Sequence, residues 1–404
     1  MFLKNIFNTC LFCLIIIGFV SLLLSCNDTT SYKKFSLKGV LSSDSSKNYA
    51  DSITLFRKSI NADEKEKALE KLFDEKAKWN RFNGAVLIVQ QGYVLFKKAY
   101  GFANYKQNIT INTQTSFQLA STSKTFTACA IMLLQQQGKL NYSDDVKKHI
   151  PNFPYDGITI KLLLSHRSGL PNYMYFAYCY INNYTPPFNN DQLVQMMINE
   201  KPPIYSKPNK RFSYCNTNYA LLAVIIEKVS GMSYPNFMHD YIFSPLKMEN
   251  TWVNTAENSL AYTNKTIAYS GNFKVEENDF LDGIYGDKNI YSNVEDLYKW
   301  DQSLYNQTLL KAETLEEAFT GKSKERKGIN NYGYGFRILN NKNGSKVVYH
   351  NGWWHCYTTT FYRELNTKIC IIILSNKYNK TVYHISDILN ILSISPSING
   401  VELE

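Results

Sequence analysis

Ser121 and Lys124 stand three residues apart at the start of a segment with helical periodicity. Between residues 122 and 137 the apolar positions recur at steps of three and four, and Gly138 follows as a natural stop. Residues three apart on a helix share a face, so the lysine amine can reach the serine hydroxyl. A serine hydroxyl is a poor nucleophile until a neighbouring base takes its proton, so the pair predicts a nucleophile beside its base. The positive end of the helix dipole disfavours the lysine cation and favours the neutral amine that this chemistry needs.

Two more groups of residues could take part in the same chemistry. Tyr214 and Asn216 stand where a loop runs into a predicted helix, and His350, Gly352 and Trp353 stand at the end of a predicted strand. Taken alone, each group also has a structural interpretation. The serine and lysine could belong to a helix N-cap, the tyrosine and asparagine could cap the next helix, and the third group could be a hairpin with an aromatic plug.

The elements that must position these residues predict an α/β fold of the α+β type. A mostly antiparallel sheet is flanked by helices, and an all-helical region is inserted into it. We expect one domain over 53–395, with an α/β part at about 53–117 and 286–393 and a helical part at about 118–285. Period-two and period-3.6 patterns predict a hairpin of strands, four later strands and two covering helices: 84–89, 93–100, 332–339, 346–350, 357–364, 368–375, 62–79 and 382–392.

Two segments of the helical part receive a structural interpretation. His166 ends an apolar run, and a histidine there is typically a hydrogen-bonded structural residue, so we leave it out of the mechanism. The tyrosine-rich segment 172–184 shows no helical period, and we interpret it as a loop that packs down, with a lid over the pocket as the alternative.

The N-terminus predicts export and a lipid anchor. Lys4 precedes an apolar run that ends in Leu24-Ser25-Cys26, which resembles a bacterial lipoprotein signal whose cysteine becomes the lipidated first residue. We therefore expect a signal peptide over 1–25, lipidation at Cys26 and a polar, flexible tether over 26–52. The protein would then lie in the cell envelope, anchored to a membrane and facing the periplasm or the outer surface. A simple transmembrane anchor is the alternative.

Composition narrows the set of partners and cofactors. The 404 residues are 44% hydrophobic and 19% charged, as in an ordinary globular chain. The net charge is +10, but no run of Lys and Arg reaches the density of a nucleic-acid patch, so no nucleic-acid partner is expected. Five cysteines remain after Cys26, an odd number without the spacing of a disulfide framework or a zinc site. We expect free thiols, no metal and no cofactor.

Taken together in chain order, the three motifs resemble those of the serine β-lactamase and penicillin-binding-protein superfamily, in its class C β-lactamase-related branch. The phrases around His166, Tyr214 and Tyr291 support the resemblance, which covers about 83–376. It implies that Ser121 attacks a carbonyl and becomes acylated, while Lys124 and Tyr214 share the proton transfers.

The same resemblance implies the substrate contacts. Asn216 would hydrogen-bond the substrate amide, and the backbone N–H groups of Ser121 and Trp353 would hold the oxyanion, each donor contributing about 3 kcal/mol. His350 and Gly352 would line the substrate site as the third motif. The chain has no Gly-x-Ser-x-Gly elbow, P-loop or His-Glu-x-x-His, which removes the main competing hydrolase and nucleotide-binding interpretations.

The third motif departs from the β-lactamase pattern. His350 and Asn351 replace the usual lysine and threonine before the glycine, and a histidine with a pKa near ~6.5 is only partly charged at neutral pH. Variants of this type resemble the D-peptidase and esterase members. Asn289 and Cys356 stand where relatives commonly have glycine, so both positions depart from the family pattern.

The resemblance leaves the substrate open. A small molecule or peptide, either a β-lactam, a D-amino-acid peptide of peptidoglycan origin or a carboxylic ester, fits the motifs, because fold and nucleophile do not fix specificity. The rival from another class is a non-catalytic envelope lipoprotein that binds peptidoglycan stems or a partner protein.

Overall fold

The computed structural model describes residues 52–79, 81–180, 187–323, 330–341 and 344–393. The chain forms two units, Met1–Arg57 and Lys58–Glu404, and every element named below belongs to the second. The predicted signal peptide, Cys26 and the predicted tether up to residue 51 lie outside the described residues. Within the described ranges, no helix combines the length and the apolar character needed to cross a membrane.

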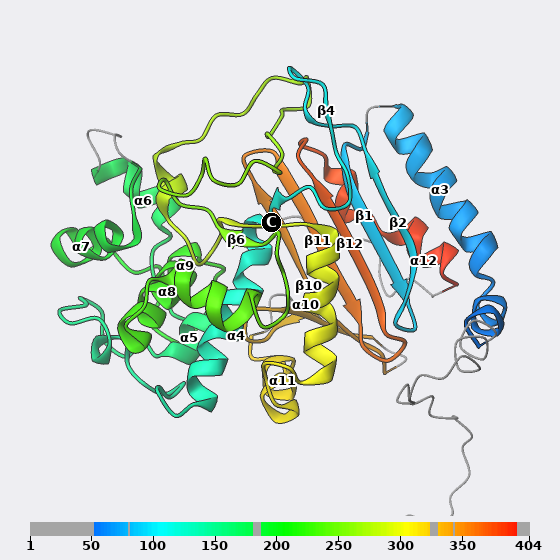
Figure 1. Cartoon of the computed structure of the whole chain (residues 1–404). Helices are drawn as coiled ribbons and strands as arrows, with labels where there is room; N and C mark the ends of the chain where they lie inside the picture. Colours follow the sequence, from blue (N-terminus) through cyan, green and yellow to red (C-terminus); the bar gives the residue numbers. More distant parts are fainter. Residues whose placement is uncertain (1–51, 80, 181–186, 324–329, 342–343, 394–404) are drawn as a thin grey trace, which may run out of the picture. The chain divides into compact units, whose positions relative to one another are not determined.

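A seven-stranded sheet built from both ends of the chain positions the site. The strand order is β2-β1-β12-β11-β10-β9-β8, and every neighbouring pair is antiparallel, as predicted. The strands are β1 (Gly84–Gln90), β2 (Tyr93–Tyr100), β8 (Asn330–Tyr332), β9 (Arg337–Asn340), β10 (Lys346–Trp354), β11 (Tyr357–Glu364) and β12 (Ile369–Ser375). Figure 1 shows the N-terminal hairpin lying against the C-terminal strands.

Local sequence explains the centre of this sheet. Every residue of β1 and β12 is buried, which is typical of strands covered on both faces and accounts for their continuous apolar sequences. The tight turn between β1 and β2 places Gln91 at φ 53° and Gly92 at φ 80°, the left-handed geometry that favours a two-residue hairpin. The predicted hairpin is therefore confirmed.

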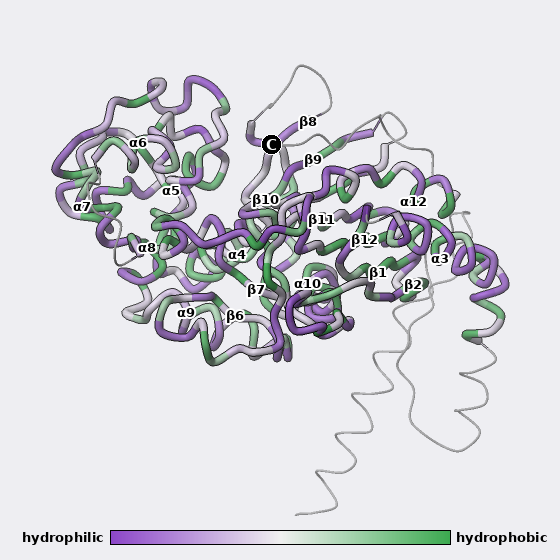
Figure 2. The backbone as a smooth tube through the Cα atoms, turned by 90° about the horizontal axis from the view of Figure 1, so that it is seen from above, coloured by the Kyte–Doolittle hydropathy of each residue, from purple (hydrophilic) through white to green (hydrophobic). Residues whose placement is uncertain are grey.

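Helices cover the two faces of the sheet. Helix α3 (Ala62–Lys78) packs on β2 and on α12 (Ser386–Ile391), whereas α10 (Val294–Asn306) packs on β1 and β12. Figure 2 shows α3 and α12 on one side of the strands and α10 on the other. The buried residues Leu69 and Phe73 of α3 are four apart, which places them on the face towards the sheet.

The helical region between the strands carries the predicted nucleophile. A 3₁₀ turn, η1 (Ala120–Thr122), leads into α4 (Ser123–Gln136), which packs along α8 (Asn216–Ser230). Helix α8 ends at Gly231, whose φ of 71° is the left-handed C-cap conformation. The remaining helices are α5 (Ile160–Leu164), α6 (Tyr173–Tyr180), α7 (Asn190–Glu200), α9 (Tyr234–Met238) and α11 (Ala312–Ala318).

Three predictions of secondary structure were wrong in detail. The strand predicted at 332–339 is a hairpin of β8 and β9, because Gly335 adopts φ 80° in the turn between them. The helix predicted at 382–392 is divided into a 3₁₀ turn, η5 (Lys380–Tyr383), and α12, because His384 leaves the helical region with ψ 86°. The tyrosine-rich segment forms helix α6 over its first part, and residues 181–186 lie outside the described ones.

Helix α6 has the helical period that the tyrosines conceal. Its buried residues Tyr173, Phe176 and Ala177 are spaced by three and four, so one face packs inward while Tyr175 and Tyr178 remain exposed. Because tyrosines stand on both the buried and the exposed face of α6, residue type does not distinguish the two faces in the sequence. The five cysteines after Cys26 are all free and all lie in the described part of the chain, as predicted.

Candidate active site

Ser121 lies in the 3₁₀ turn η1, directly before α4. The residue before it, Ala120, adopts φ 48°, a left-handed conformation that costs a residue with a side chain roughly 1–2 kcal/mol. This strained residue turns the chain from β5 (Phe117–Gln118) into the helix. Ser121 is 7% exposed, so its hydroxyl is held at the edge of the interior and remains close to solvent.

Lys124 lies one helical turn from the serine and is completely buried. Its Nζ is 3.0 Å from Ser121 Oγ and 3.0 Å from the backbone oxygen of Asp287. A neutral amine has two hydrogens and one lone pair, so donation of one hydrogen to the Asp287 carbonyl leaves the lone pair free to accept the serine proton. The geometry therefore suits a lysine that acts as general base.

Strand β10 passes beside the serine and needs a glycine there. A Cβ on Gly352 would lie 2.3 Å from the Leu119 oxygen, closer than side-chain atoms can approach, and 3.0 Å from Ser121 N, an unusually tight contact. Strand β9 pairs with β10 only as far as Tyr349, so beyond that residue η1 takes the place of a neighbouring strand. The two backbone N–H groups predicted to hold the oxyanion, those of Ser121 and Trp353, thus belong to adjacent segments.

The side chain of Trp353 is 49% exposed and lies near Tyr378, with 6.2 Å between ring centroids. Successive residues of a strand point to opposite faces. The next residue, Trp354, is buried instead, and its Nε1 donates to Asp282 Oδ1 at 2.6 Å. Any contribution of Trp353 to the site is therefore expected from its backbone.

Tyr214 brings a phenol next to the lysine. The Lys124 Nζ is 5.0 Å from the centroid of its ring, and the guanidinium carbon of Arg337 is 5.4 Å from the same centroid. The Arg337 cation, joined by Lys124 once that amine has taken the serine proton, favours negative charge on the phenol oxygen, which is what a tyrosine needs to exchange protons with substrate. Arg337, on strand β9, was not among the predicted site residues.

His166 supports Tyr214 from the other side. The two rings lie 4.3 Å apart between centroids, and His166 Nδ1 accepts hydrogen bonds from Cys215 N at 3.1 Å and Asn218 Nδ2 at 3.2 Å. Burial, together with the charges of Lys124 and neighbouring groups, lowers the pKa of His166 well below its usual 6.5. A permanently neutral imidazole that holds the start of α8 agrees with its exclusion from the mechanism.

His350 lies in strand β10 and is completely buried. Its Nδ1 is 2.6 Å from the backbone oxygen of Asn351, and its Nε2 is 3.1 Å from the Tyr332 hydroxyl. Burial raises the pKa of Tyr332 well above 10, so the phenol keeps its proton and can donate it to Nε2. Both ring nitrogens thus have protein partners, and direct contact with substrate would require the Tyr332 hydroxyl to move.

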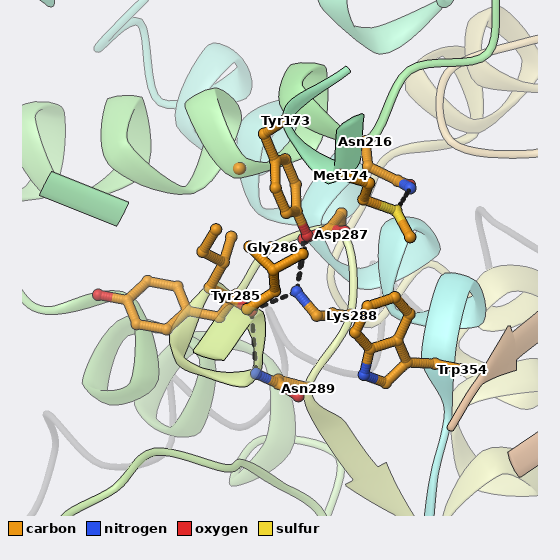
Figure 3. A network of polar contacts seen from close by, with 12 residues as sticks. Tyr173, Met174, Asn216, Tyr285, Gly286, Asp287, Lys288, Asn289 and Trp354 are labelled. Carbon is orange, nitrogen blue, oxygen red and sulfur yellow. Dashed lines mark hydrogen bonds and ion pairs between the residues drawn. The ribbon is translucent and has the colours of Figure 1, made fainter. Parts of the chain in front are cut away.

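Asn216 is the first residue of α8, and its amide already has a neighbour. Its Nδ2 contacts Met174 Sδ at 2.6 Å, whereas its Oδ1 has no hydrogen-bond partner among the described residues. Figure 3 shows Met174 and Asn216 facing each other above Asp287. A substrate carbonyl that accepts from Asn216 Nδ2 would therefore displace the thioether of Met174, whereas a substrate N–H would donate to the unpartnered Oδ1.

The two positions where relatives commonly have glycine do adopt glycine-like backbone conformations. Asn289 has φ 72° and Cys356 has φ 65°. Asparagine tolerates this region, and the Asn289 amide is held by Gln118 Nε2 at 3.0 Å and by the Ile284 carbonyl at 2.9 Å. These side-chain hydrogen bonds hold Asn289 in the left-handed conformation without a glycine.

One group of side chains of the metal-ligand type lies near the turn after β10. Potential ligand atoms of Asp279, Asp282 and His355 lie within 4.8 Å of one another. Burial alone would lower the pKa of His355, but the carboxylates of Asp279 and Asp282, 3.8 Å and 3.2 Å from its Nε2, outweigh it and raise the pKa to about 10. The imidazolium is therefore the cation that neutralises these carboxylates at neutral pH.

The structure thus brings Ser121, Lys124, Tyr214, His350 and Gly352 around one point, and it places Asn216 beside Met174. Cys26 lies outside the described residues. Sequence reasoning missed several residues that touch this group, because each reaches it only through tertiary packing: Met174, Asp287, Tyr332 and Arg337.

Comparison with known proteins shows which proteins the chain resembles. A family model described as Beta-lactamase matches residues 69–395. Penicillin-binding protein 4* of Bacillus subtilis (strain 168) is 36% identical over 332 residues, which is 79% of this chain and 73% of the relative.

Solved structures resemble the fold over most of their length. The octameric penicillin-binding protein homologue from Pyrococcus abyssi superimposes with a TM-score of 0.72 at 28% identity, over 82% of this chain and 78% of that one. D-amino acid amidase from Ochrobactrum anthropi SV3 has a TM-score of 0.68 at 21% identity, over 81% and 97%, and so shares the fold.

Proposed function

Because the chain belongs to the β-lactamase family, we propose that it is a serine hydrolase that forms an acyl-enzyme at Ser121. The observation that carries the proposal is the placement of Lys124 Nζ, fully buried and 3.0 Å from both Ser121 Oγ and the Asp287 carbonyl. A lysine used only to cap a helix would not be buried with its amine on a serine hydroxyl.

The proposed reaction has two halves. In acylation, neutral Lys124 takes the Ser121 proton while the serine oxygen bonds to the substrate carbonyl carbon, and the oxyanion is held by the N–H groups of Ser121 and Trp353. Tyr214 passes a proton to the leaving nitrogen or oxygen as that bond breaks. In deacylation the ionised Tyr214 takes a proton from the water that attacks the ester carbonyl, the bond between that carbon and the serine oxygen breaks, and Lys124 returns its proton to Ser121 Oγ.

We propose an amide or lactam carbonyl as the substrate bond, in a β-lactam or a D-amino-acid peptide. The related Penicillin-binding protein 4* and the structural similarity to a D-amino acid amidase support this class. His350 differs from the lysine of dedicated β-lactamases, and the engagement of both its nitrogens favours substrates that need no fixed cation for a carboxylate. A carboxylic ester is the alternative within the same fold.

The test is an intact-mass time course of the detergent-solubilised full-length protein with a penicillin and, separately, with a peptide ending in D-Ala-D-Ala. Ser121→Ala is the control. A serine-dependent adduct that persists indicates a penicillin-binding peptidase, whereas drug hydrolysis without an adduct indicates a β-lactamase. If protein, drug and peptide all stay unchanged, and an activated ester is also left intact, the non-catalytic alternative replaces the proposal.

We further propose that the protein acts in the cell envelope, anchored by lipid on Cys26. The support is the Leu24-Ser25-Cys26 sequence at the end of an apolar run. Labelling of cells with a radioactive fatty acid should mark the wild-type protein and leave the Cys26→Ala variant unmarked. Equal labelling of both proteins would refute the anchor.

A further inference from the structure

A second buried lysine lies behind the catalytic one. Lys288 Nζ donates to the Tyr173 hydroxyl at 2.6 Å, and that hydroxyl donates to Asp287 Oδ2 at 2.8 Å. Each of the three residues is at most 2% exposed. Figure 3 shows this network, with the Trp354 ring facing Lys288 and the Met174 and Asn216 pair above it. We call these three residues the buried triad.

The buried triad contains one positive and one negative charge. Burial raises the pKa of Tyr173 well above 10, so its phenol stays neutral and links the other two residues. Lys288 Nζ also donates to the Ile284 carbonyl at 3.1 Å and lies 5.0 Å from the centroid of the Trp354 ring. In a low-dielectric interior such a pair persists because each charge offsets the cost of burying the other.

The carboxylate of Asp287 is only partly neutralised by hydrogen bonds. Its Oδ1 has no hydrogen-bond partner among the described residues and lies 3.9 Å from Lys288 Nζ. The negative charge of Asp287 is therefore compensated by the positive charge of Lys288 more than by direct hydrogen bonds. Removal of that charge would leave a buried anion with the Tyr173 hydroxyl as its hydrogen-bond donor.

Asp287 also touches the catalytic lysine through its backbone. Its carbonyl oxygen is 3.0 Å from Lys124 Nζ. Since the carboxylate and the carbonyl belong to one residue, bond lengths keep the carboxylate within about 8 Å of that amine. At an effective dielectric constant of about 20, an unbalanced unit charge at this distance moves a titration by about one to two pH units.

We propose that Lys288 is a positioning residue that neutralises Asp287 and so keeps Lys124 in the neutral form needed to deprotonate Ser121. The inference rests on the proposed function, because it assigns Lys124 the role of base. An uncompensated Asp287 carboxylate would stabilise the Lys124 ammonium and suppress acylation at neutral pH. With Lys288 in place, the triad has no net charge and the amine can lose its proton at lower pH.

Other titratable and charged groups also surround Lys124. They come from η1, the segment after α5, the start of α8, and strands β9 and β10: Ser121, His166, Tyr214, Cys215, Tyr219, Arg337 and His350. None of them is changed by substitutions at positions 287 and 288. Differences between such variants therefore measure the effect of the Asp287 and Lys288 charges.

The test removes the Lys288 charge and the Asp287 charge in separate variants, which should shift the pH profile of acylation in opposite directions. The rate of Ser121 acylation by a fluorescent penicillin, or by an activated ester if that is the substrate class, is measured from pH 5 to 10 for the full-length protein. The acidic limb of the profile is the low-pH range in which the acylation rate rises as Lys124 loses its proton. In Lys288→Met this limb should move to higher pH by about one unit, and in Asp287→Asn it should move to lower pH. The double variant should return the limb to near the wild-type position.

The matched control is Lys299→Met, which makes the same substitution at a surface lysine paired with Asp296. Its limb should stay at the wild-type pH. Because Lys288→Met could prevent folding, the double variant and Asp287→Asn carry the test alone if needed. An unshifted limb in Asp287→Asn, or single variants that both shift in the same direction, would overturn the inference.

A second readout separates this inference from the proposed function. The ε-carbon resonances of ¹³C-labelled lysine report the Lys124 titration directly, once assigned with Lys124→Arg. If Ser121 is never acylated by any probe, the proposed function fails, while this titration still shows whether Asp287 and Lys288 control Lys124. A Lys124 titration that is identical in wild type and Asp287→Asn refutes the electrostatic role.

Discussion

Replacing Gly352 with alanine should disable the site without removing any of the proposed catalytic side chains. A Cβ at this position would lie 2.3 Å from the Leu119 oxygen, 2.5 Å from Thr359 Oγ1 and 3.0 Å from Ser121 N. Thr359 Oγ1 belongs to a side chain, but the other two atoms are backbone. Strand β10 and turn η1 must therefore separate.

The size of the effect follows from these contacts. To reach an ordinary van der Waals distance of 3.4 Å from the Leu119 oxygen, the two segments must move apart by about 1 Å. Overpacking of this kind typically costs about 1–3 kcal/mol of stability. A 1 Å displacement of reacting groups, or the loss of one oxyanion donor, slows catalysis by roughly 10²–10³-fold.

The assay is the second-order rate of acylation with a fluorescent penicillin or activated ester, paired with urea unfolding of the same protein. Gly271→Ala is the matched control, because no atom lies within 4 Å of its added Cβ and its φ is not in the left-handed region. We expect Gly271→Ala to behave as wild type. A Gly352→Ala variant that keeps both wild-type acylation and wild-type stability would refute the proposed contact between β10 and the nucleophile turn.

Three further predictions follow from the described contacts. Lys124→Gln should reduce acylation by at least roughly 10²-fold at neutral pH, because it removes the base; an unchanged rate would contradict the mechanism. His355→Gln should lower the free energy of unfolding by about 2 kcal/mol at pH 7, after discounting for partial exposure. Because the pKa of His355 is raised to about 10 in the folded state, its stabilisation is complete below about pH 6.5 and is lost as pH rises through 10. The free energies of unfolding of His355→Gln and wild type, measured in urea, should therefore become equal near about pH 11. Arg363→Ala should lower the free energy of unfolding by about 3–5 kcal/mol, because Arg363 Nε lies 2.5 Å from the buried Asp301 carboxylate and its removal leaves that charge unpaired. A decrease below about 1 kcal/mol in urea unfolding would contradict this.

Sequence alone was enough for most elements near the nucleophile. Local periodicity predicted the helix that carries Lys124, the start of α8 after Cys215 and the strands β11 and β12. This periodicity is strong where one face of an element is uniformly apolar. The family resemblance supplied the order of the motifs. The assignment of catalytic roles to individual residues remains a prediction.

The remainder could not be read from local patterns, because it depends on distant parts of the chain meeting. Arg337 lies on a strand that was predicted to continue through residues 333–336, and its position over Tyr214 depends on that turn. The carbonyl of Asp287 has no sequence signature at all, since every residue carries one. The strand-end position of His350 did not reveal that the Tyr332 hydroxyl contacts its Nε2 while the Asn351 backbone oxygen contacts its Nδ1.

The pairing of β1 with β12 makes assembly of the site depend on strands that are synthesised late. The Ser375 hydroxyl donates to the carbonyl of Asn83, a residue 292 positions earlier, and β1 pairs along its length with β12. Contacts this far apart in sequence carry a large loop-closure cost and make folding slow. While the chain is being synthesised, Ser121 and Lys124 emerge long before Gly352 and β12 exist. A nascent chain can therefore carry the nucleophile and its base without the strand that completes the oxyanion site, so activity would begin only when the last strands have joined the sheet.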